Sequence, residues 1–186
     1  MKAILKRFIG SLILMLLVMV PVMAQDTAPI TFSKILNDTF GMTGVMPEGW
    51  TLIGPGVWNR GSSTTDVTRL IQQSAPASPD AILTALMPQL GLDSAPDSVG
   101  TYKTDALTWT LYKIDVTAGG FDLSIDLGLA NAEGKTFLVL LQTASDEYDT
   151  LHESVFLPVL DAFAPMTVEP TPTVPPPPYT AEDVWT

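Results

Sequence analysis

The run "FDLSIDLGLA" at residues 121–130 limits the possible folds of this chain more than any other stretch. Apolar and polar residues alternate through it without interruption: Phe121, Leu123, Ile125, Leu127 and Leu129 on one side, and Asp122, Ser124, Asp126 and Gly128 on the other. A period of two predicts a β-strand with one buried face and one solvated face. The glycine-containing turns "AGG" and "NAEG" stand on either side of it. We therefore expect antiparallel neighbours joined by tight turns.

The two neighbouring runs also read as strands. In "ALTWTLYKIDV" at 106–116 the apolar alternation changes phase at Tyr112, which indicates a β-bulge near that residue. The run "KTFLVLLQT" at 135–143 is apolar at nearly every position, as in a central strand that is covered on both faces. Three strands joined by short turns predict an antiparallel meander.

The first of two expected helices follows Ser78. That residue is a good N-cap, Pro79 suits the first helical position, and Gly91 is a typical helix terminator. Pro88 should end or kink the helix, because proline removes a helical hydrogen bond.

The second expected helix spans about 147–163. Leu151, Val155, Val159 and Phe163 recur at intervals of four, which predicts one apolar helix face. Acidic residues gather at its start, where the positive end of the helix dipole stabilises negative side chains. Pro158 lies inside the pattern and should kink this helix.

The amino-terminal third of the globular part contains further strands at 39–47, 56–61 and 66–75, and residues 48–54 read as a turn followed by a short strand. Strands come first, then a helix, then the meander and the second helix. This order predicts an α+β fold: a mainly antiparallel, twisted sheet with about two helices packed on it.

Both ends of the chain differ from this middle part. Residues 1–24 combine a basic start, an apolar run from Phe8 to Val22 and a small-residue site, which predicts a secretory signal peptide cleaved between Ala24 and Gln25. An uncleaved membrane anchor is the alternative, although the apolar run is shorter than the roughly 20 residues that cross a bilayer. Residues 25–29 read as a polar lead-in and 30–164 as the α+β domain. Residues 165–186 read as a proline-rich linker and disordered tail, since seven of the fourteen residues from Pro165 to Pro178 are proline.

Charge and composition exclude several partners and chemistries. Three of the nine basic residues lie in the predicted signal, so the mature chain carries six basic and 20 acidic residues, a formal charge of −14. Such a charge disfavours nucleic acid and anionic membrane surfaces as partners. The absence of cysteine excludes disulfides, zinc–thiolate sites and cysteine nucleophiles. We predict no cofactor and no metal, and the oligomeric state stays open.

No grouping of residues predicts a catalytic site. The single histidine, His152, has no evident partner in the sequence, and no G-x-S-x-G motif occurs. Asp122 and Asp126 would lie about 13 Å apart along a strand, too far to hold one cation between them. We therefore expect no catalytic residue and no metal ligand.

Aromatic residues near arginines offer the best candidate binding site. Trp58 and Arg60 in "PGVWNRG" stand beside an expected loop, so we predict that Trp58 is an exposed contact residue with Arg60 near it. Trp50 and Trp109 lie on apolar faces and are expected in the core.

The stretch "FGMTGVMPEGW" at 40–50 resembles the opening of PsbP/Mog1-like domains, in which a glycine-rich strand runs into a proline, a glycine and a tryptophan. The strand at 135–143 followed by the helix at 147–163 is similar to the closing pattern of that family. The resemblance implies an antiparallel sheet with helices on its faces and a non-enzymatic role in binding or assembly. The chain is also similar to accessory domains that proline-rich linkers join to the catalytic domains of secreted bacterial hydrolases.

The functional prediction is a secreted, non-enzymatic binding or assembly module that recognises a protein or cell-envelope ligand. It would act outside the cell, in the periplasm or at the cell surface, away from the membrane once the signal is removed. Two alternatives stay open: an amino-terminal accessory domain of a secreted hydrolase, and a hydrolase in its own right that uses only carboxylates.

Overall fold

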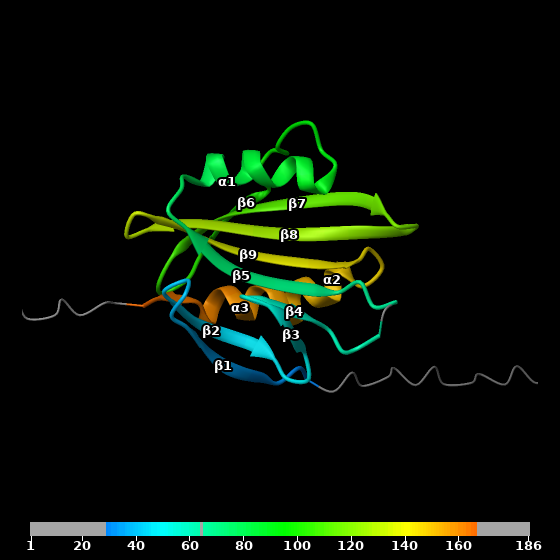
Figure 1. Ribbon diagram of the computed structural model, residues 1–186, viewed down its shortest axis with the longest axis horizontal. Helices are drawn as coiled ribbons and strands as arrows, with labels where there is room; N and C mark the ends of the chain where they lie inside the picture. Colours follow the sequence, from blue (N-terminus) through cyan, green and yellow to red (C-terminus); the bar gives the residue numbers. More distant parts are fainter. Residues whose placement is uncertain (1–28, 64, 167–186) are drawn as a thin grey trace, which may run out of the picture.

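A computed structural model describes residues 29–63 and 65–166, and it contains two antiparallel sheets (Figure 1). The larger sheet has the spatial order β3-β4-β5-β9-β8-β7-β6. Its strands are β3 (Thr51–Gly54), β4 (Val57–Asn59), β5 (Arg69–Ala75), β6 (Gly100–Lys103), β7 (Thr108–Ala118), β8 (Phe121–Ala132) and β9 (Lys135–Ala144). The smaller sheet has the order β1-β2-β10, from β1 (Phe32–Asn37), β2 (Met42–Pro47) and β10 (Ala164–Pro165). Together with the helices, these sheets confirm the α+β class.

The predicted meander is present as β7, β8 and β9. A two-residue turn at Gly119–Gly120 joins β7 to β8, and both residues have positive φ, 60° and 84°. That backbone conformation is the one that two-residue hairpins need, and glycine adopts it without strain. The mainly apolar strand β9 has three strands on each side of it, so the prediction that it is central is confirmed.

The predicted bulge at Tyr112 is wrong. Strands β7 and β8 pair in one unbroken register from Thr110 opposite Leu129 to Ala118 opposite Phe121. The apolar phase changes because the two halves of β7 bury opposite faces: Trp109 joins the core on one side of the sheet, and Ile114 joins the core on the other side.

The predicted solvated face of β8 is also wrong. Ser124 and Asp126 are only 2% and 3% exposed, although both carry polar side chains. Their face lies beneath the second helical segment, whose Leu160 and Phe156 approach Gly128. Alternation indicated correctly that β8 has two different faces, but it could not show that a helix covers the polar one.

The first helix, α1 (Pro79–Leu86), covers the opposite face and begins as predicted. The Ser78 hydroxyl accepts a hydrogen bond from the Ala81 N–H at 3.2 Å. At Pro88 the α-helix gives way to a 3-10 turn, η1 (Met87–Leu90), which Gly91 ends at a φ of 73°. Leu83 of α1 and Met87 of η1 pack against the apolar side of β8.

The second helical segment consists of three parts: α2 (Tyr148–Leu151), a π-helical turn η2 (His152–Phe156) and α3 (Leu157–Ala162). The sequence predicts a kink at Pro158, and the irregularity is this wider turn just before it. Proline has no N–H to donate, and its ring crowds the carbonyl four residues earlier. A π turn gives that carbonyl more room and keeps the segment continuous.

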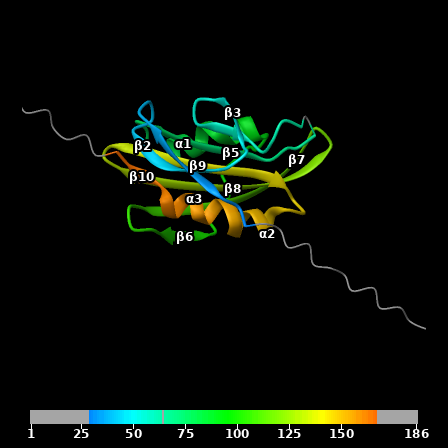
Figure 2. The same ribbon diagram turned by 90° about the horizontal axis from the view of Figure 1, so that it is seen from below.

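Figure 2 shows α1 on one side of β8 and β9, with α2 and α3 on the other. The smaller sheet lies on the same side as α3 and contacts it through β2. Two side chains of β5 attach it: Gln72 donates to the Val45 carbonyl at 2.8 Å, and Ser74 donates to the Phe40 carbonyl at 2.6 Å. The main core therefore lies between the seven-stranded sheet and a cover made of α2, α3 and the β1–β2 hairpin.

No helix within the two described ranges has the length and apolar character to cross a membrane. The predicted signal peptide, nearly all of the lead-in and the tail from residue 167 on lie outside those ranges. The predictions made for them stay predictions.

Candidate functional site

A cleft of about 600 Å³ opens where the β1–β2 hairpin, the end of β4 and the start of α2 come together. Ile30, Trp50 and Leu151 supply its apolar surface, and Arg60 and Glu147 lie in its wall. Ligand sites are commonly concave, mostly apolar, and carry a few placed polar groups. This cleft has that composition and is the candidate site.

Trp50 reaches the cleft because of the turn that leaves β2. Pro47 ends the strand, Gly49 turns the chain at a φ of 80°, and the Trp50 N–H lies 3.4 Å from the Pro47 carbonyl. The indole packs against the main core and is partly exposed. The prediction that Trp50 belongs to the core is therefore confirmed only in part, since the same ring also lines the cleft.

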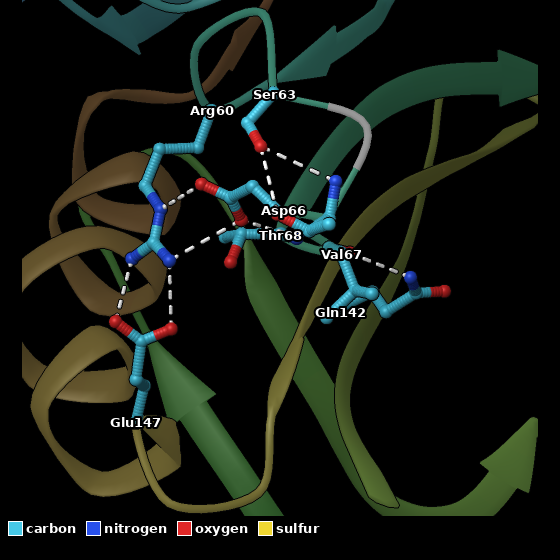
Figure 3. A network of polar contacts seen from close by, with 8 residues as sticks. Arg60, Ser63, Asp66, Val67, Thr68, Gln142 and Glu147 are labelled. Carbon is cyan, nitrogen blue, oxygen red and sulfur yellow. Dashed lines mark hydrogen bonds and ion pairs between the residues drawn. The ribbon is translucent and has the colours of Figure 1, made fainter. Parts of the chain in front are cut away.

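Arg60 lies at the centre of a polar network (Figure 3). Its Nη1 and Nη2 donate to the two carboxylate oxygens of Glu147 at 2.8 and 2.7 Å. Its Nε donates to Asp66 at 2.7 Å, and Nη2 also reaches that carboxylate at 3.2 Å. A guanidinium matches a carboxylate in this two-pronged way, which fixes orientation as well as charge. The network fastens the loop after β4 to the start of α2.

The same contacts shift two pKa values. The hydrogen bond to Glu147 is the largest influence on the Arg60 guanidinium, and despite the opposing effect of burial the pKa of Arg60 is raised. Burial alone would raise the pKa of Asp66, but hydrogen bonds from Arg60 and from the Thr68 backbone outweigh it, and this pKa is lowered. Arg60 thus stays cationic and Asp66 anionic at neutral pH.

Acidic groups outnumber the one guanidinium in the lining of the cleft. Glu48 accepts hydrogen bonds from the Thr31 hydroxyl at 2.9 Å and the Ser33 hydroxyl at 3.2 Å, and Asp146 is exposed. Glu147 occupies the cap position of α2 without a side-chain capping bond, because Arg60 engages its carboxylate. Of the acidic residues at this helix start, Glu147 therefore serves as the partner of Arg60.

The predicted exposure of Trp58 is wrong. Its side chain is only 5% exposed, in β4, where the residue stands opposite both Leu52 of β3 and Leu70 of β5. The smaller sheet covers that part of the larger one, so the indole predicted beside a loop lies in the core. Arg60, two residues later, does line the cleft. The pairing of a tryptophan and an arginine at one surface is thus present, but the tryptophan is Trp50.

A second polar cluster was missed by the sequence analysis. The Asp126 carboxylate accepts a hydrogen bond from the Tyr148 hydroxyl at 2.8 Å and lies 3.0 Å from Nδ1 of His152. The expectation that His152 has no partner is therefore incorrect. Tyr148 and His152 are four residues apart, so they lie on one helical face above β8. The Lys113 ammonium stands 4.1 Å from the centre of the Tyr148 ring.

Burial controls the protonation of this cluster. Desolvation is the largest influence on Asp126 and raises its pKa, against the hydrogen bonds from Tyr148 and His152 and the positive charge of Lys113. The pKa of Tyr148 is also raised, first by burial and then by its hydrogen bond to Asp126. None of the three residues Asp126, Tyr148 and His152 lines the cleft. Their arrangement holds α2 and η2 against the sheet, as a buried carboxylate needs bonded partners.

Within the described part of the chain, no group of three or more acidic or histidine residues is arranged to hold a metal ion. Asp122 accepts a hydrogen bond from the Thr117 hydroxyl and Asp126 accepts one from Tyr148, so the two carboxylates have different partners.

Comparison with known proteins gives a likeness in structure only. No protein-family model matches the chain, and no curated protein sequence is similar enough to match. Among solved structures, the chain is similar to the cyanobacterial PsbP of Synechocystis sp. PCC 6803, with a TM-score of 0.50 and 16% identity over 75% of this chain and 95% of that one. It is also similar to the Ran-binding protein Mog1p of Saccharomyces cerevisiae, with a TM-score of 0.50 and 8% identity over 74% and 96% of the two chains.

Identities this low are informative about fold and not about activity. Both neighbours are matched over almost their whole length. They are a PsbP and a Mog1 protein, the two kinds of protein after which the predicted PsbP/Mog1-like domains are named. The prediction made from "FGMTGVMPEGW" and from the closing strand and helix is confirmed at this level: the chain has a PsbP/Mog1-like α+β fold.

Proposed function

We propose that this domain is a protein-binding module and that its contact site is the cleft around Trp50 and Arg60. The single observation that carries the proposal is the composition of the cleft. A partly exposed indole and a fixed guanidinium meet at one concave surface. Tryptophan and arginine are the residues most enriched among the energetically dominant contacts of protein interfaces.

The fold supports a protein partner in a general way. Mog1p, one of the structural neighbours, is named a Ran-binding protein, so this architecture can serve as a binding domain. No residue of that neighbour is carried over to this chain. The accessory-domain and carboxylate-hydrolase alternatives stay untested predictions.

The charge of the cleft indicates what the partner should present. Glu48, Asp146 and Glu147 give it an excess of negative charge over Arg60, in a chain that is strongly acidic as a whole. A basic patch on the partner would be steered toward such a surface, and this steering weakens as salt is added. We therefore propose a partner surface that combines an apolar side chain for Trp50 with lysine or arginine at the rim.

Site-specific photo-crosslinking tests the proposal. A photoreactive amino acid at Thr150, in the cleft lining, should form a discrete adduct with a protein from the native envelope extract. The same amino acid at Thr117, which lies outside the cleft, should not. Equal adducts from both positions, or none from Thr150, would contradict the proposal.

Charge reversal gives a matched pair of variants. Asp146→Lys changes the rim of the cleft, and Asp97→Lys makes the same change at an exposed position elsewhere. Only the first should lower the yield of the Thr150 adduct, and the difference should shrink at high salt because exposed charges are screened. Equal loss from both variants would mean that the partner responds to net charge and not to this cleft.

We also propose export of the protein, with removal of residues 1–24. The intact mass of the native protein tests this directly. A mass that begins at Gln25 supports export, and a mass that retains Met1 or Lys2 contradicts it.

A further inference from the structure

A second depression, of about 420 Å³, lies on the other side of Trp50 between the β1–β2 hairpin and β3. Met46, Trp50 and Trp58 line it. Leu36 and Leu52 also line it, and these two leucines are 66% and 61% exposed to solvent. We call this depression the β1–β3 groove. None of the side chains that line it is charged. Large apolar side chains that are this exposed at a groove indicate a surface that is covered by something.

The chain itself carries a suitable occupant. Residues 170–179 read "PTPTVPPPPY", ten residues without a charge and with six prolines. Such a sequence favours the polyproline II conformation. Proline-rich segments in this conformation bind to grooves lined by aromatic side chains, since little conformational entropy remains to be lost. The β1–β3 groove offers the partly exposed indole of Trp50, with the buried Trp58 also in its lining, and no charged side chain.

The path of the backbone places this segment within reach. The Met166 N–H donates to the Gly41 carbonyl at 2.9 Å, in the turn between β1 and β2. Thr39, in the same turn, lines the groove. From Met166 to Pro175 is nine residues, which span about 28 Å in a polyproline II conformation. That length is comparable with the width of a small domain.

Charge directs the segment to the groove and away from the cleft. Residues 167–186 contain Glu169, Glu182 and Asp183 and no basic residue. The acidic rim of the cleft would repel them, whereas the uncharged groove would not. Attachment to the same chain also gives an effective concentration in the millimolar range, so that even weak docking is well populated.

We propose that the proline-rich segment Pro170–Tyr179 docks in the β1–β3 groove of its own chain. This inference is independent of the function proposed for the cleft. It assigns the exposed Leu36 and Leu52 to an intramolecular contact.

The lack of cysteine allows a direct test in the full chain. A nitroxide label on Thr180→Cys should broaden the backbone amide signals of Leu36 and Leu52 in NMR spectra of dilute protein. The amide of Phe121 is the internal reference, because the β7–β8 turn lies at the opposite end of the molecule from β10 (Figures 1 and 2). Broadening at the groove no greater than at Phe121 would overturn the proposal.

Substitutions in the groove and in the proline-rich segment test whether contact between these two parts causes the broadening. Leu36→Ser combined with Leu52→Ser should abolish the broadening, while Val99→Ser, at another exposed apolar side chain, should leave it unchanged. If the double variant does not fold, glycine–serine replacement of Pro175–Pro178 in the full chain gives the same test by altering the proline-rich segment. Broadening that survives removal of the prolines would overturn the proposal.

Mixed samples identify the chain that supplies the segment. Spin-labelled protein without ¹⁵N is mixed with ¹⁵N protein without the spin label. Broadening in this mixture would mean that a second copy fills the groove, which overturns docking within one chain. Broadening that occurs only when both labels are on one chain is the expected result.

Discussion

Replacing Asp126 by alanine should be among the most destabilising changes available in this domain. The side chain is 3% exposed and accepts hydrogen bonds from two groups on the second helical segment. Asp126→Ala leaves the Tyr148 hydroxyl and the His152 ring without their shared acceptor. Hydrogen bonds to a charged group contribute about 1.5–3 kcal/mol each, so the loss of both costs about 3–6 kcal/mol. Domains of this size have a total stability of about 5–15 kcal/mol, so the loss is a large fraction of it.

Asp126→Asn separates the shape of this group from its charge. An amide can still accept from Tyr148, so the variant should fold. Burial raises the pKa of Asp126 above the unfolded value of about 3.9. Between those two pKa values the folded state binds more protons than the unfolded state, so this group's contribution to stability falls as pH rises. The wild type should therefore lose stability relative to Asp126→Asn from about pH 4 upward, by about 1.4 kcal/mol for each unit by which the pKa is raised.

Urea unfolding followed by circular dichroism, at several pH values between 4 and 8, measures both effects. With a slope of about 2 kcal/mol per M, Asp126→Ala should lower the unfolding midpoint by about 2 M. Asp122→Ala is the matched control, because Asp122 lies on the same strand and is exposed. The reasoning is refuted if the two alanine variants are equally stable, or if the wild type and Asp126→Asn show the same dependence on pH.

A pair of glycine substitutions tests the turns, and a double-mutant cycle tests the ion pair. Gly56→Ala places a Cβ against the Gln72 backbone oxygen at a φ of 67°, and should cost about 2–4 kcal/mol in urea unfolding. Gly49→Ala, at a φ of 80° but in open space, should cost only about 1 kcal/mol, so equal losses would contradict the steric argument. A double-mutant cycle with Arg60→Gln and Glu147→Gln should give a coupling free energy of about 1 kcal/mol that decreases in 1 M salt, since both side chains are partly exposed. Coupling that does not change with salt would contradict the assignment of an ion pair.

The elements that the sequence predicted well are those whose cause is local. Ser78 and Gly91 mark the ends of the first helical segment because a hydroxyl cap and a left-handed glycine act within a few residues. Gly119 marks the β7–β8 hairpin for a similar reason. The two-glycine turn leaves almost no choice of connection, so β7 and β8 could be paired without knowledge of the rest of the fold.

The errors concern faces that are covered by distant segments. Asp126 lies in an alternating strand, and only the arrival of a helix 22 residues later converts its solvated side into a buried one. Trp58 is buried because a hairpin from the beginning of the chain lies over β4. The interval between Tyr148 and His152 was a signal that a polar pair shares one helix face, but it did not identify Asp126 as their partner. Trp50 and Arg60 meet in the cleft for the same non-local reason.

The pairing of β10 with β2 has a consequence for the order of folding. Strands β6 to β9 follow one another along the chain and can form by short loop closures, whereas β5 must find β9 and β10 must find β2. Ala164 stands opposite Thr43, 121 residues earlier, so this contact has a high entropic cost of closure and is expected to form late. Until it forms, one edge of β2 stays unpaired and open to association with other chains. A nascent domain therefore passes through a stage in which its meander is complete and its amino-terminal hairpin is still exposed to misassembly.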